Sequence, residues 1–232
     1  MFHVEPSPAS VIAQAAALGV DLGPHQAERL LEHLHLLQKW NRTHNLVGPG
    51  DIDGWLARHT LDSLAPVPYL PVGRGFDVGS GAGFPGIPIA VARPDCQLTL
   101  CEPRQKRLAF LRTVVAALQL PSVDLRVSPV SPTAPPEGAN FVLSRATFLL
   151  PAWLALGARL LAPGGILVAF LGVDPWADER LRVEGGNHGL LLQHLRHYAV
   201  GDGPERAIAV FQKGRAGVPR GTPGGGPPRS EP

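Results

Sequence analysis

The sequence predicts an α/β protein in which helices connect the strands of a mostly parallel β-sheet. From residue 75 onward, short apolar runs rich in β-branched residues alternate with helical segments, which is the pattern of parallel strands joined by crossover helices. With 232 residues, of which 44% are hydrophobic, the chain can bury one sizeable core. We therefore expect one main domain at residues 71–213, preceded by a helical cap at residues 1–70.

Two amphipathic helices are predicted in the cap. The segment 24–40 opens with a proline, which suits the first turn of a helix, and it places Leu30, Leu34 and Leu37 at helical spacing. A second helix is predicted over 52–64, before the prolines and glycine of "APVPYLPVG" break the pattern. The first twenty residues lack a basic leader and no run approaches the length of a membrane span, so we expect a soluble cytoplasmic protein without a membrane partner.

Six strands and three connecting helices are predicted after the cap. The strands are "GFDVG", "QLTLCE", "VDLRV", "NFVLS", "GGILVAFLG" and "RAIAVFQ", and the helices span residues 85–93, 104–118 and 148–161. The C-terminal segment 214–232 is dominated by glycine and proline. It cannot bury enough apolar surface to offset its ordering entropy, so we predict that it is disordered.

Charge and cysteine content place few constraints on function. The 21 Lys and Arg residues against 19 Asp and Glu give a net charge of +2, which is too small to indicate a nucleic-acid-binding protein by itself. Cys96 and Cys101 are five residues apart on a predicted strand, so their side chains point to opposite faces and no disulfide is expected. His33 and His35 do not share a helix face, and we expect no metal site.

The stretch "FDVGSGAGFPG" at residues 76–86 is the clearest functional signal. A predicted strand ends at Asp77 and Val78, and the chain then passes through Gly79, Gly81 and Gly83 into a helix. A turn of this kind brings bare backbone N–H groups close to a ligand at a helix N-terminus. Glycine-rich turns also serve to pack a strand against a helix, so the loop alone leaves both interpretations open.

Glu102 strengthens the prediction of a ligand site. It ends the next predicted strand, nineteen residues after Gly83, where a carboxylate can accept hydrogen bonds from both hydroxyls of a ribose. The alternative is a solvated residue at a helix N-terminus. Both a dinucleotide such as NAD and S-adenosylmethionine fit this arrangement. Asp77 suits the ammonium of a methionine moiety and would repel a pyrophosphate, and Phe84 stands where the dinucleotide pattern has its last glycine, so the sequence favours S-adenosylmethionine.

The chain resembles the bacterial 16S ribosomal RNA guanine-N7 methyltransferases, also called glucose-inhibited division protein B. The matching strings are "KWNRTHNLV", "RHTLDSL", "FDVGSGAGFPGIPIAVARPD", "KRLAFLR" and "SRA", which run in the family's order from about Gln26 to Ala146, with a looser match to Gln212. The resemblance implies a Rossmann-like class I methyltransferase with a mostly parallel seven-stranded sheet, helices on both faces and a small N-terminal helical cap.

The resemblance also implies an activity and a partner. The enzyme would transfer a methyl group from S-adenosylmethionine to N7 of a guanosine in the decoding-region loop of 16S rRNA, acting on the RNA or on the 30S subunit, and we expect a monomer. Guanine N7 carries a lone pair and no proton, so the reaction requires no general base. In-line positioning of the reactants, which is worth up to ~7–11 kcal/mol, is then the main contribution of the site.

The resemblance implies a set of cofactor-binding residues. Glycines 79, 81 and 83 would line the methionine part, Asp77 would face its ammonium directly or through water, and Glu102 would hold the ribose. The full predicted set is Asp77, Gly79, Ser80, Gly81, Gly83, Phe84, Glu102 and Arg145.

Arg58, Asp62 and Arg145 are the candidate catalytic residues. Arg58 and Asp62 are four residues apart and can pair across one helical turn. Their helix, which includes His59 and Ser63, either closes over the cofactor or guanine, or carries a surface ion pair that contributes less than about 1 kcal/mol. Arg145 ends an apolar strand, and two roles are open for it. It either contacts the substrate through a phosphate or guanine O6 alone, because an arginine on N7 would block the nucleophile, or it pairs inside the fold.

Other positions leave alternatives open. Asn45 and Arg206 match family positions, and Lys106 and Arg107 face either RNA or solvent. Leu171 stands where the family tends to have lysine. After the third predicted strand, Ser128 and Ser131 stand where the family usually has an acidic residue near the adenine of the cofactor. A diverged paralogue that methylates another RNA or has weak activity is therefore the second hypothesis, followed by an NAD-dependent oxidoreductase and a non-catalytic RNA-binding module.

Overall fold

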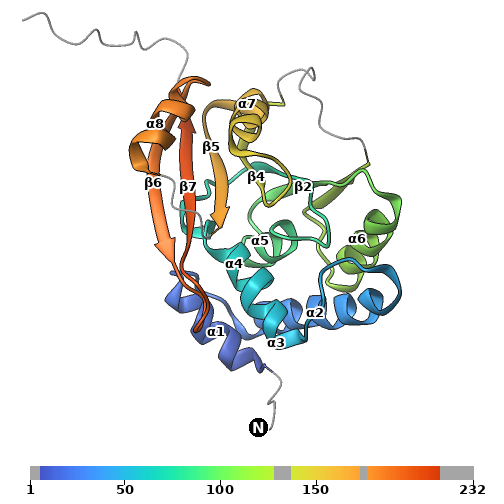
Figure 1. Cartoon of the computed structure of the whole chain (residues 1–232). Helices are drawn as coiled ribbons and strands as arrows, with labels where there is room; N and C mark the ends of the chain where they lie inside the picture. Colours follow the sequence, from blue (N-terminus) through green and yellow to red (C-terminus); the bar gives the residue numbers. More distant parts are fainter. Residues whose placement is uncertain (1–5, 128–136, 173–176, 215–232) are drawn as a thin grey trace, which may run out of the picture.

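A computed structural model of the protein describes residues 6–127, 137–172 and 177–214, and a single seven-stranded sheet forms its centre (Figure 1). The strand order is β3-β2-β1-β4-β5-β7-β6. Strands β1 to β5 are parallel to one another, whereas β7 is antiparallel to both β5 and β6. The strands are β1 Arg74–Val78, β2 Gln97–Cys101, β3 Val123–Arg126, β4 Ala139–Ser144, β5 Leu161–Gly172, β6 Leu190–Tyr198 and β7 Arg206–Lys213.

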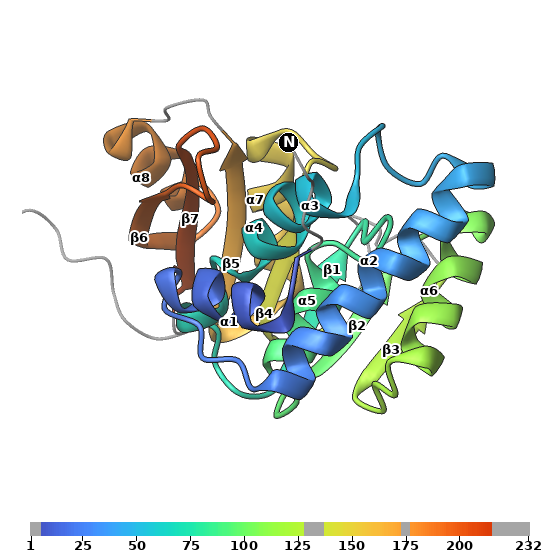
Figure 2. The ribbon, with the colours of Figure 1, turned by 90° about the horizontal axis from the view of Figure 1, so that it is seen from below.

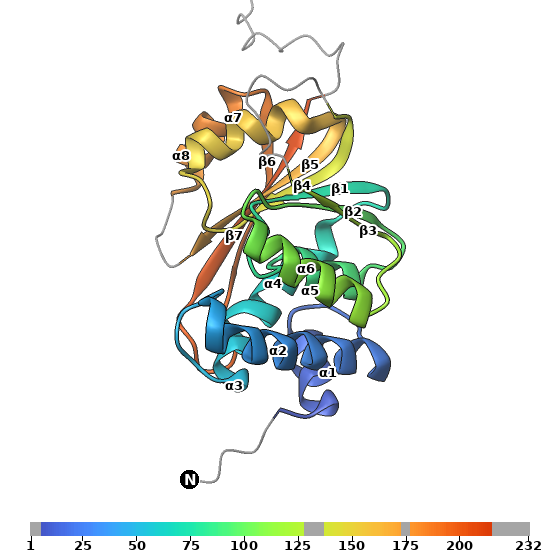
Figure 3. The same ribbon diagram turned by 90° about the vertical axis from the view of Figure 1, so that its right-hand side faces the viewer.

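Helices cover both faces of this sheet (Figure 3). The pair α7 and α8 lies on one side, and α5 and α6 lie on the other together with the N-terminal helices. The helices are α1 Pro8–Ala17, α2 Pro24–His44, α3 Ile52–Trp55, α4 Asp62–Leu64, α5 Gly86–Ala92, α6 Gln105–Ala117, α7 Leu150–Leu160 and α8 Asp178–Gly186, with a π-helical turn η1 Leu56–Leu61 and a 3-10 turn η2 Val67–Tyr69. The predicted fold class, a mostly parallel sheet with helices on both faces, is confirmed.

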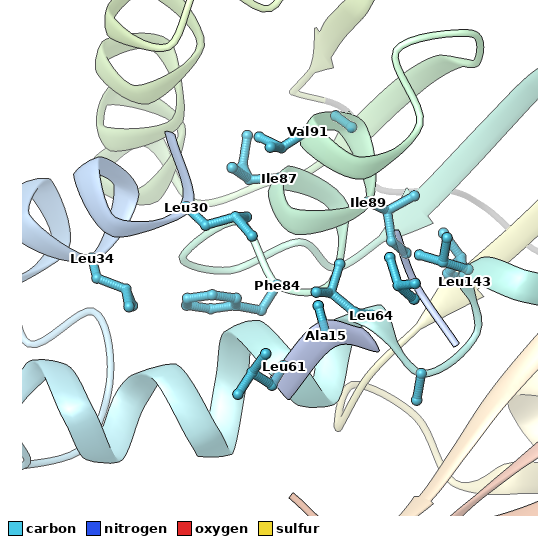
Figure 4. Close-up of a cluster of buried hydrophobic side chains, with 14 of the residues drawn as sticks. Ala15, Leu30, Leu34, Leu61, Leu64, Phe84, Ile87, Ile89, Val91 and Leu143 are labelled. Carbon is cyan, nitrogen blue, oxygen red and sulfur yellow. The ribbon is translucent and has the colours of Figure 1, made fainter. Parts of the chain in front are cut away.

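The N-terminal helices share a hydrophobic core with one face of the sheet. Helix α2 packs against α5 and α6 (Figure 2), and α4 packs against α5. Figure 4 shows Phe84 lying between side chains of α2 and Leu61 at the end of η1. The cluster continues through Ile87 and Ile89 of α5 to Leu143 of β4. The division into a cap and a methyltransferase domain at residue 70 stays a prediction, and this core crosses it without interruption.

A second core fills the opposite face. Trp153 and Leu154 of α7 and Leu181 of α8 pack against Val142 of β4 and Phe211 of β7. Trp153 is almost fully buried, and its indole Nε1 donates a hydrogen bond of 2.8 Å to the carbonyl of Val168 in β5. This bond fixes the orientation of the ring at the carboxyl half of the sheet.

Three elements were not anticipated from the sequence. Helix α1 begins at a Ser7 cap followed by Pro8, a start signal that the sequence does contain. Helix α8 has an almost entirely polar exposed surface and buries only Leu181 and Gly185. Strand β6 has an irregular burial pattern along the sheet edge, so neither strict alternation nor an apolar run marks it. The predicted helix over 52–64 is continuous, although its middle is π-helical.

The described residues form neither a disulfide nor a cluster of metal-binding side chains. Cys96 and Cys101 are both free and buried, and burial raises the pKa of the Cys101 thiol to about 12. Across the described ranges, none of the helices has the length and apolar character needed to cross a membrane. The same ranges hold no group of three or more His, Cys, Asp or Glu side chains placed to bind a metal ion.

Candidate active site

The predicted site residues gather at the carboxyl ends of the parallel strands. Strand β1 lies between β2 and β4, so the sheet continues from β1 toward β2 on one side and toward β4 on the other. At such a switch point a crevice opens outside the carboxyl ends of the strands. Asp77 lies in β1, Glu102 follows β2, and Arg145 follows β4. The topology thus brings together residues from three separate parts of the sequence.

The loop after β1 adopts a conformation that requires glycine. Gly79, Gly81 and Gly83 have φ angles of 82°, 59° and 91°, in the left-handed region that other residues rarely occupy. The N–H of Gly79 donates to the carbonyl of Cys101 at 2.8 Å, and a Cβ on Gly79 would approach Thr147 Oγ1 to 2.5 Å. Ser80 is buried, and its hydroxyl donates to the carbonyl of Asp77 at 3.0 Å.

Glu102 is tied directly to this loop. Its side chain is only 4% exposed, so the alternative of a solvated residue does not hold. Its Oε2 accepts a hydrogen bond of 2.9 Å from Gly81 N, and its Oε1 accepts one of 2.9 Å from Arg104 N. The guanidinium of Arg107 lies 3.9 Å from Oε2, whereas Lys106 is exposed. A carboxylate has about four acceptor positions, so Glu102 retains capacity for two further donors.

Asp77 lies beneath the loop and is fully buried. Its Oδ2 accepts a hydrogen bond of 2.9 Å from Gly86 N at the start of α5. Among the described residues its Oδ1 has no hydrogen-bond partner although it is inaccessible to solvent. Burial raises the pKa of this carboxyl to about 7, against the opposing effect of the nearby Ser80 hydroxyl and of the hydrogen bond from Gly86 N. A buried carboxylate with one unpaired oxygen favours a cation beside it.

Phe84 is held by two histidines of the N-terminal helices. The ring of His33 lies 4.8 Å from that of Phe84, and the ring of His59 lies 5.1 Å from it. His33 Nε2 is 3.0 Å from the carbonyl of Ala82, which can only accept, so the proton must be on Nε2. Burial lowers the pKa of both histidines to about 4, so both are neutral at pH 7.

Asp62 forms the centre of a second polar cluster. Its Oδ2 accepts a hydrogen bond of 2.9 Å from Arg145, while its Oδ1 lies 3.0 Å from Arg206 and accepts one of 2.7 Å from the hydroxyl of Tyr198. Arg145 also donates to the carbonyls of Arg58 and His59, and it lies over the Phe84 ring at 5.4 Å. Arg145 therefore does pair inside the fold, which was one of the two alternatives for it.

The pair that Arg58 and Asp62 could form across one helical turn is not present in the structure. Asp62 points into the protein, where Arg145 and Arg206 occupy both of its oxygens. Arg58 lies at the surface and its Nε donates to the carbonyl of Gly54 at 3.1 Å. Burial decides the outcome, because a carboxylate removed from water needs the charged partners that the end of β4 and the start of β7 supply.

Two adjoining pockets open beside these groups. One of about 440 Å³ is lined by Arg58, His59, Asp62, Arg145 and Arg206, among others. The other, of about 240 Å³, lies at the ends of β4 and β5 against α7. Ala146, Phe170 and Leu171 line both pockets. Ser128 and Ser131, the other positions that differ from the family pattern, lie outside the described residues.

Comparison with known proteins decides the family. Residues 26–182 match the model of the family described as rRNA small subunit methyltransferase G. The chain belongs to this family. Proteins named ribosomal RNA small subunit methyltransferase G are similar to it: that of Ralstonia nicotianae is 41% identical over 182 residues, covering 75% of this chain and 82% of that protein. That of Methylobacillus flagellatus is 39% identical over 158 residues, covering 68% and 77%.

Solved structures support the fold assignment of this methyltransferase. A SAM-dependent methyltransferase from Aquifex aeolicus aligns with a TM-score of 0.53 and 15% identity, over 75% of this chain and 97% of that one. The family and the class I methyltransferase fold predicted from the sequence are therefore confirmed. The comparison favours methyl transfer over the dinucleotide oxidoreductase that the glycine loop alone left open.

Sequence reasoning missed part of this methyltransferase's site. Tyr198 lies on β6, which was not predicted, and it is 136 positions from its partner Asp62. The contacts of His33 and His59 with Phe84 have no sequence signal beyond membership of amphipathic helices. Arg206 was noted as a family position, and the structure shows it beside Asp62. Asn45 ends α2 in the left-handed conformation, with φ of 47°.

Proposed function

We propose that this protein binds S-adenosylmethionine between the glycine loop and Glu102, and transfers its methyl group to N7 of a guanosine in the decoding-region loop of 16S rRNA. The observation that carries the proposal is the buried Glu102 carboxylate bonded to Gly81 N at the carboxyl end of β2. The acidic residue and the glycine turn form one unit, as a ribose-binding site of this fold requires.

The residues present fit this cofactor. Each Glu102 oxygen accepts one backbone N–H, which leaves acceptor positions for the two ribose hydroxyls. The unpaired Oδ1 of Asp77 gives the buried negative charge that an ammonium would compensate, directly or through water. The glycine backbone allows close approach because φ values of 59° to 91° exclude larger residues. When bound, the cofactor supplies an electrophilic methyl group on a sulfonium.

The protein contributes orientation and electrostatics to the transfer. N7 needs no deprotonation, so none of the named side chains has to act as a general base. In-line positioning is worth up to ~7–11 kcal/mol. Positive charge moves onto the base during transfer. Asp62 offsets one of the two positive charges of Arg145 and Arg206 in the adjoining pocket. Their remaining N–H groups can hold a phosphate or guanine O6, which leaves N7 free to attack the methyl group.

A methyl-transfer assay tests the proposal. Labelled S-adenosylmethionine and the protein are incubated with 30S subunits from a strain that lacks this modification, and N7-specific strand scission locates the product. Cleavage in the decoding-region loop is expected, with at least a tenfold loss of cofactor affinity in Glu102→Gln. The apolar Leu171, which lines both pockets, favours a second candidate, methylation of another RNA. Cofactor binding without cleavage in the 30S subunit would support that candidate.

A further inference from the structure

The smaller of the two pockets has an uncharged wall. It lies at the carboxyl ends of β4 and β5, and its described lining consists of aliphatic, aromatic and hydroxyl side chains. The larger pocket beside it presents the guanidinium groups of Arg58, Arg145 and Arg206. Cationic groups suit the phosphates of an RNA strand, whereas an uncharged aromatic wall suits a nucleobase. The two pockets together present the chemistry that one nucleotide needs.

An aromatic side chain stands at the rim of the smaller pocket. Phe148 is 40% exposed, and its ring is nearly parallel to that of Trp153, with an interplanar angle of 10° and 6.0 Å between centroids. Trp153 is held in place by its hydrogen bond to Val168. Phe148 therefore has a fixed ring on one side while part of its surface is open. Unpaired bases of RNA stack on aromatic side chains presented in this way.

The inner wall of the pocket adjoins the proposed cofactor loop. The hydroxyl of Ser144 donates to the carbonyl of Val78 at 2.8 Å, and that of Thr147 lies 3.4 Å from the carbonyl of Gly79. Both acceptors belong to the end of β1 and the start of the glycine loop. A base in this pocket would lie next to the site of the methyl donor, as an acceptor in an in-line transfer must.

We propose that this pocket receives the unpaired target guanine of the RNA substrate, with Phe148 stacking on its face. The inference rests on the proposed function, because it assigns the acceptor subsite of the same reaction. Guanine must leave its base stack to enter, as other enzymes that act on bases require.

Replacement of Phe148 tests the assignment in the full-length protein. Phe148→Leu keeps an apolar side chain but removes the ring, and we expect kcat/KM for 30S subunits to fall about tenfold while the Kd for S-adenosylmethionine stays within twofold. Phe148→Tyr keeps the ring and should retain activity within about threefold of wild type. Leu191→Ala, at an exposed leucine of β6 that is 60% accessible, is the control and should behave as wild type.

A binding measurement makes the test independent of turnover. Saturation-transfer NMR with guanosine monophosphate should show transfer to the base H8 in the wild type and a loss of it in Phe148→Leu. Equal saturation in the two proteins, or a kcat/KM of Phe148→Leu within twofold of wild type, would overturn the assignment. A wild-type enzyme inactive on 30S subunits would instead contradict the proposed function, while the NMR comparison would still decide whether the pocket binds guanine.

Discussion

Individual side chains of this protein are placed where their ordinary charge states are unfavourable. His33 is a neutral donor to a backbone carbonyl inside the core, and its second ring nitrogen has no partner among the described residues. Asp77 is a buried carboxyl with one unpaired oxygen. Both lie against the glycine loop, so their protonation is coupled to the proposed cofactor site.

Replacement of His33 by phenylalanine should change how stability depends on pH. The pKa of His33 is about 4 in the folded protein and near 6.5 when unfolded. As pH falls from about 6.5 to 4, only the unfolded state takes up this proton, so stability is lost by roughly 3 kcal/mol. His33→Phe should be less stable than wild type at pH 7, by about 1 kcal/mol for the lost hydrogen bond. Because the variant lacks the acid-induced loss, it should be more stable than wild type at pH 4.5, by about 1–2 kcal/mol.

Urea unfolding at pH 7 and pH 4.5 measures this difference. The raised pKa of Asp77 makes its contribution to stability change with pH in the direction opposite to that of His33, and it does so equally in both proteins. The quantity to compare is therefore the difference in the free energy of unfolding between variant and wild type at each pH. His35→Phe, at an exposed position two residues along the same helix, is the matched control for the introduction of a phenylalanine side chain. A His33→Phe difference that is the same at both pH values would contradict the assignment of a buried neutral imidazole.

Asp77 should make cofactor binding depend on pH. Its pKa is about 7 without a ligand, and a bound ammonium or sulfonium would lower it. The complex then favours the ionised form, so affinity for S-adenosylmethionine should rise from pH 6 to pH 8 and binding at pH 7 should release protons. Calorimetry in two buffers of different ionisation enthalpy measures that release. Asp77→Asn should reduce it and weaken binding; an unchanged proton release would show that Asp77 does not sense the cofactor.

At the scale of elements, strands and loops that are encoded by one contiguous stretch of sequence were predictable, whereas contacts between distant parts of the chain were not. The strands β1 to β5 and β7 follow from apolar runs, and the glycine loop with Glu102 follows from a fixed spacing along one βαβ unit. Strand β6 carries Tyr198 to Asp62 across 136 positions, and no local pattern encodes that contact. The same limit explains why the sequence offered only Arg58, four residues away, as an ion-pair partner for Asp62, whereas tertiary packing gives it Arg145 and Arg206.

The Asp62 cluster should therefore be a strong link between the helical segment 52–64 and strands β4, β6 and β7 of the sheet. Asp62→Asn would leave two guanidinium groups without their carboxylate, and breaking a buried pair of this kind costs about 3–5 kcal/mol. Denaturant unfolding measures the loss. Asp178→Asn breaks an exposed pair with Arg182 and should cost less than about 1 kcal/mol. Similar losses in both variants would show that the cluster contributes no more than a surface ion pair.

At the scale of the whole molecule, the continuous core predicts that the N-terminal helices and the sheet unfold together. Leu30, Leu34 and Leu61 pack in the same cluster as Phe84 and Ile87, so separating them would expose apolar surface on both sides. Residues 6–70 would then be an integral layer of the methyltransferase and not an independently stable cap. The histidine contacts to Phe84 add a reason, because the glycine loop depends on helices from this layer.

Unfolding followed by two probes tests this prediction. The first probe is tryptophan fluorescence, which reports partly on Trp40 and Trp55 in the N-terminal layer. The second probe is the near-UV signal of bound S-adenosylmethionine, which reports on the glycine loop after β1. A single cooperative transition, with cofactor binding lost at the same denaturant concentration as the fluorescence change, is expected. Leu34→Ala should shift both probes together, with a loss of about 2–5 kcal/mol. Loss of the fluorescence signal while cofactor binding persists would mean that the first 70 residues can detach from a sheet that stays folded.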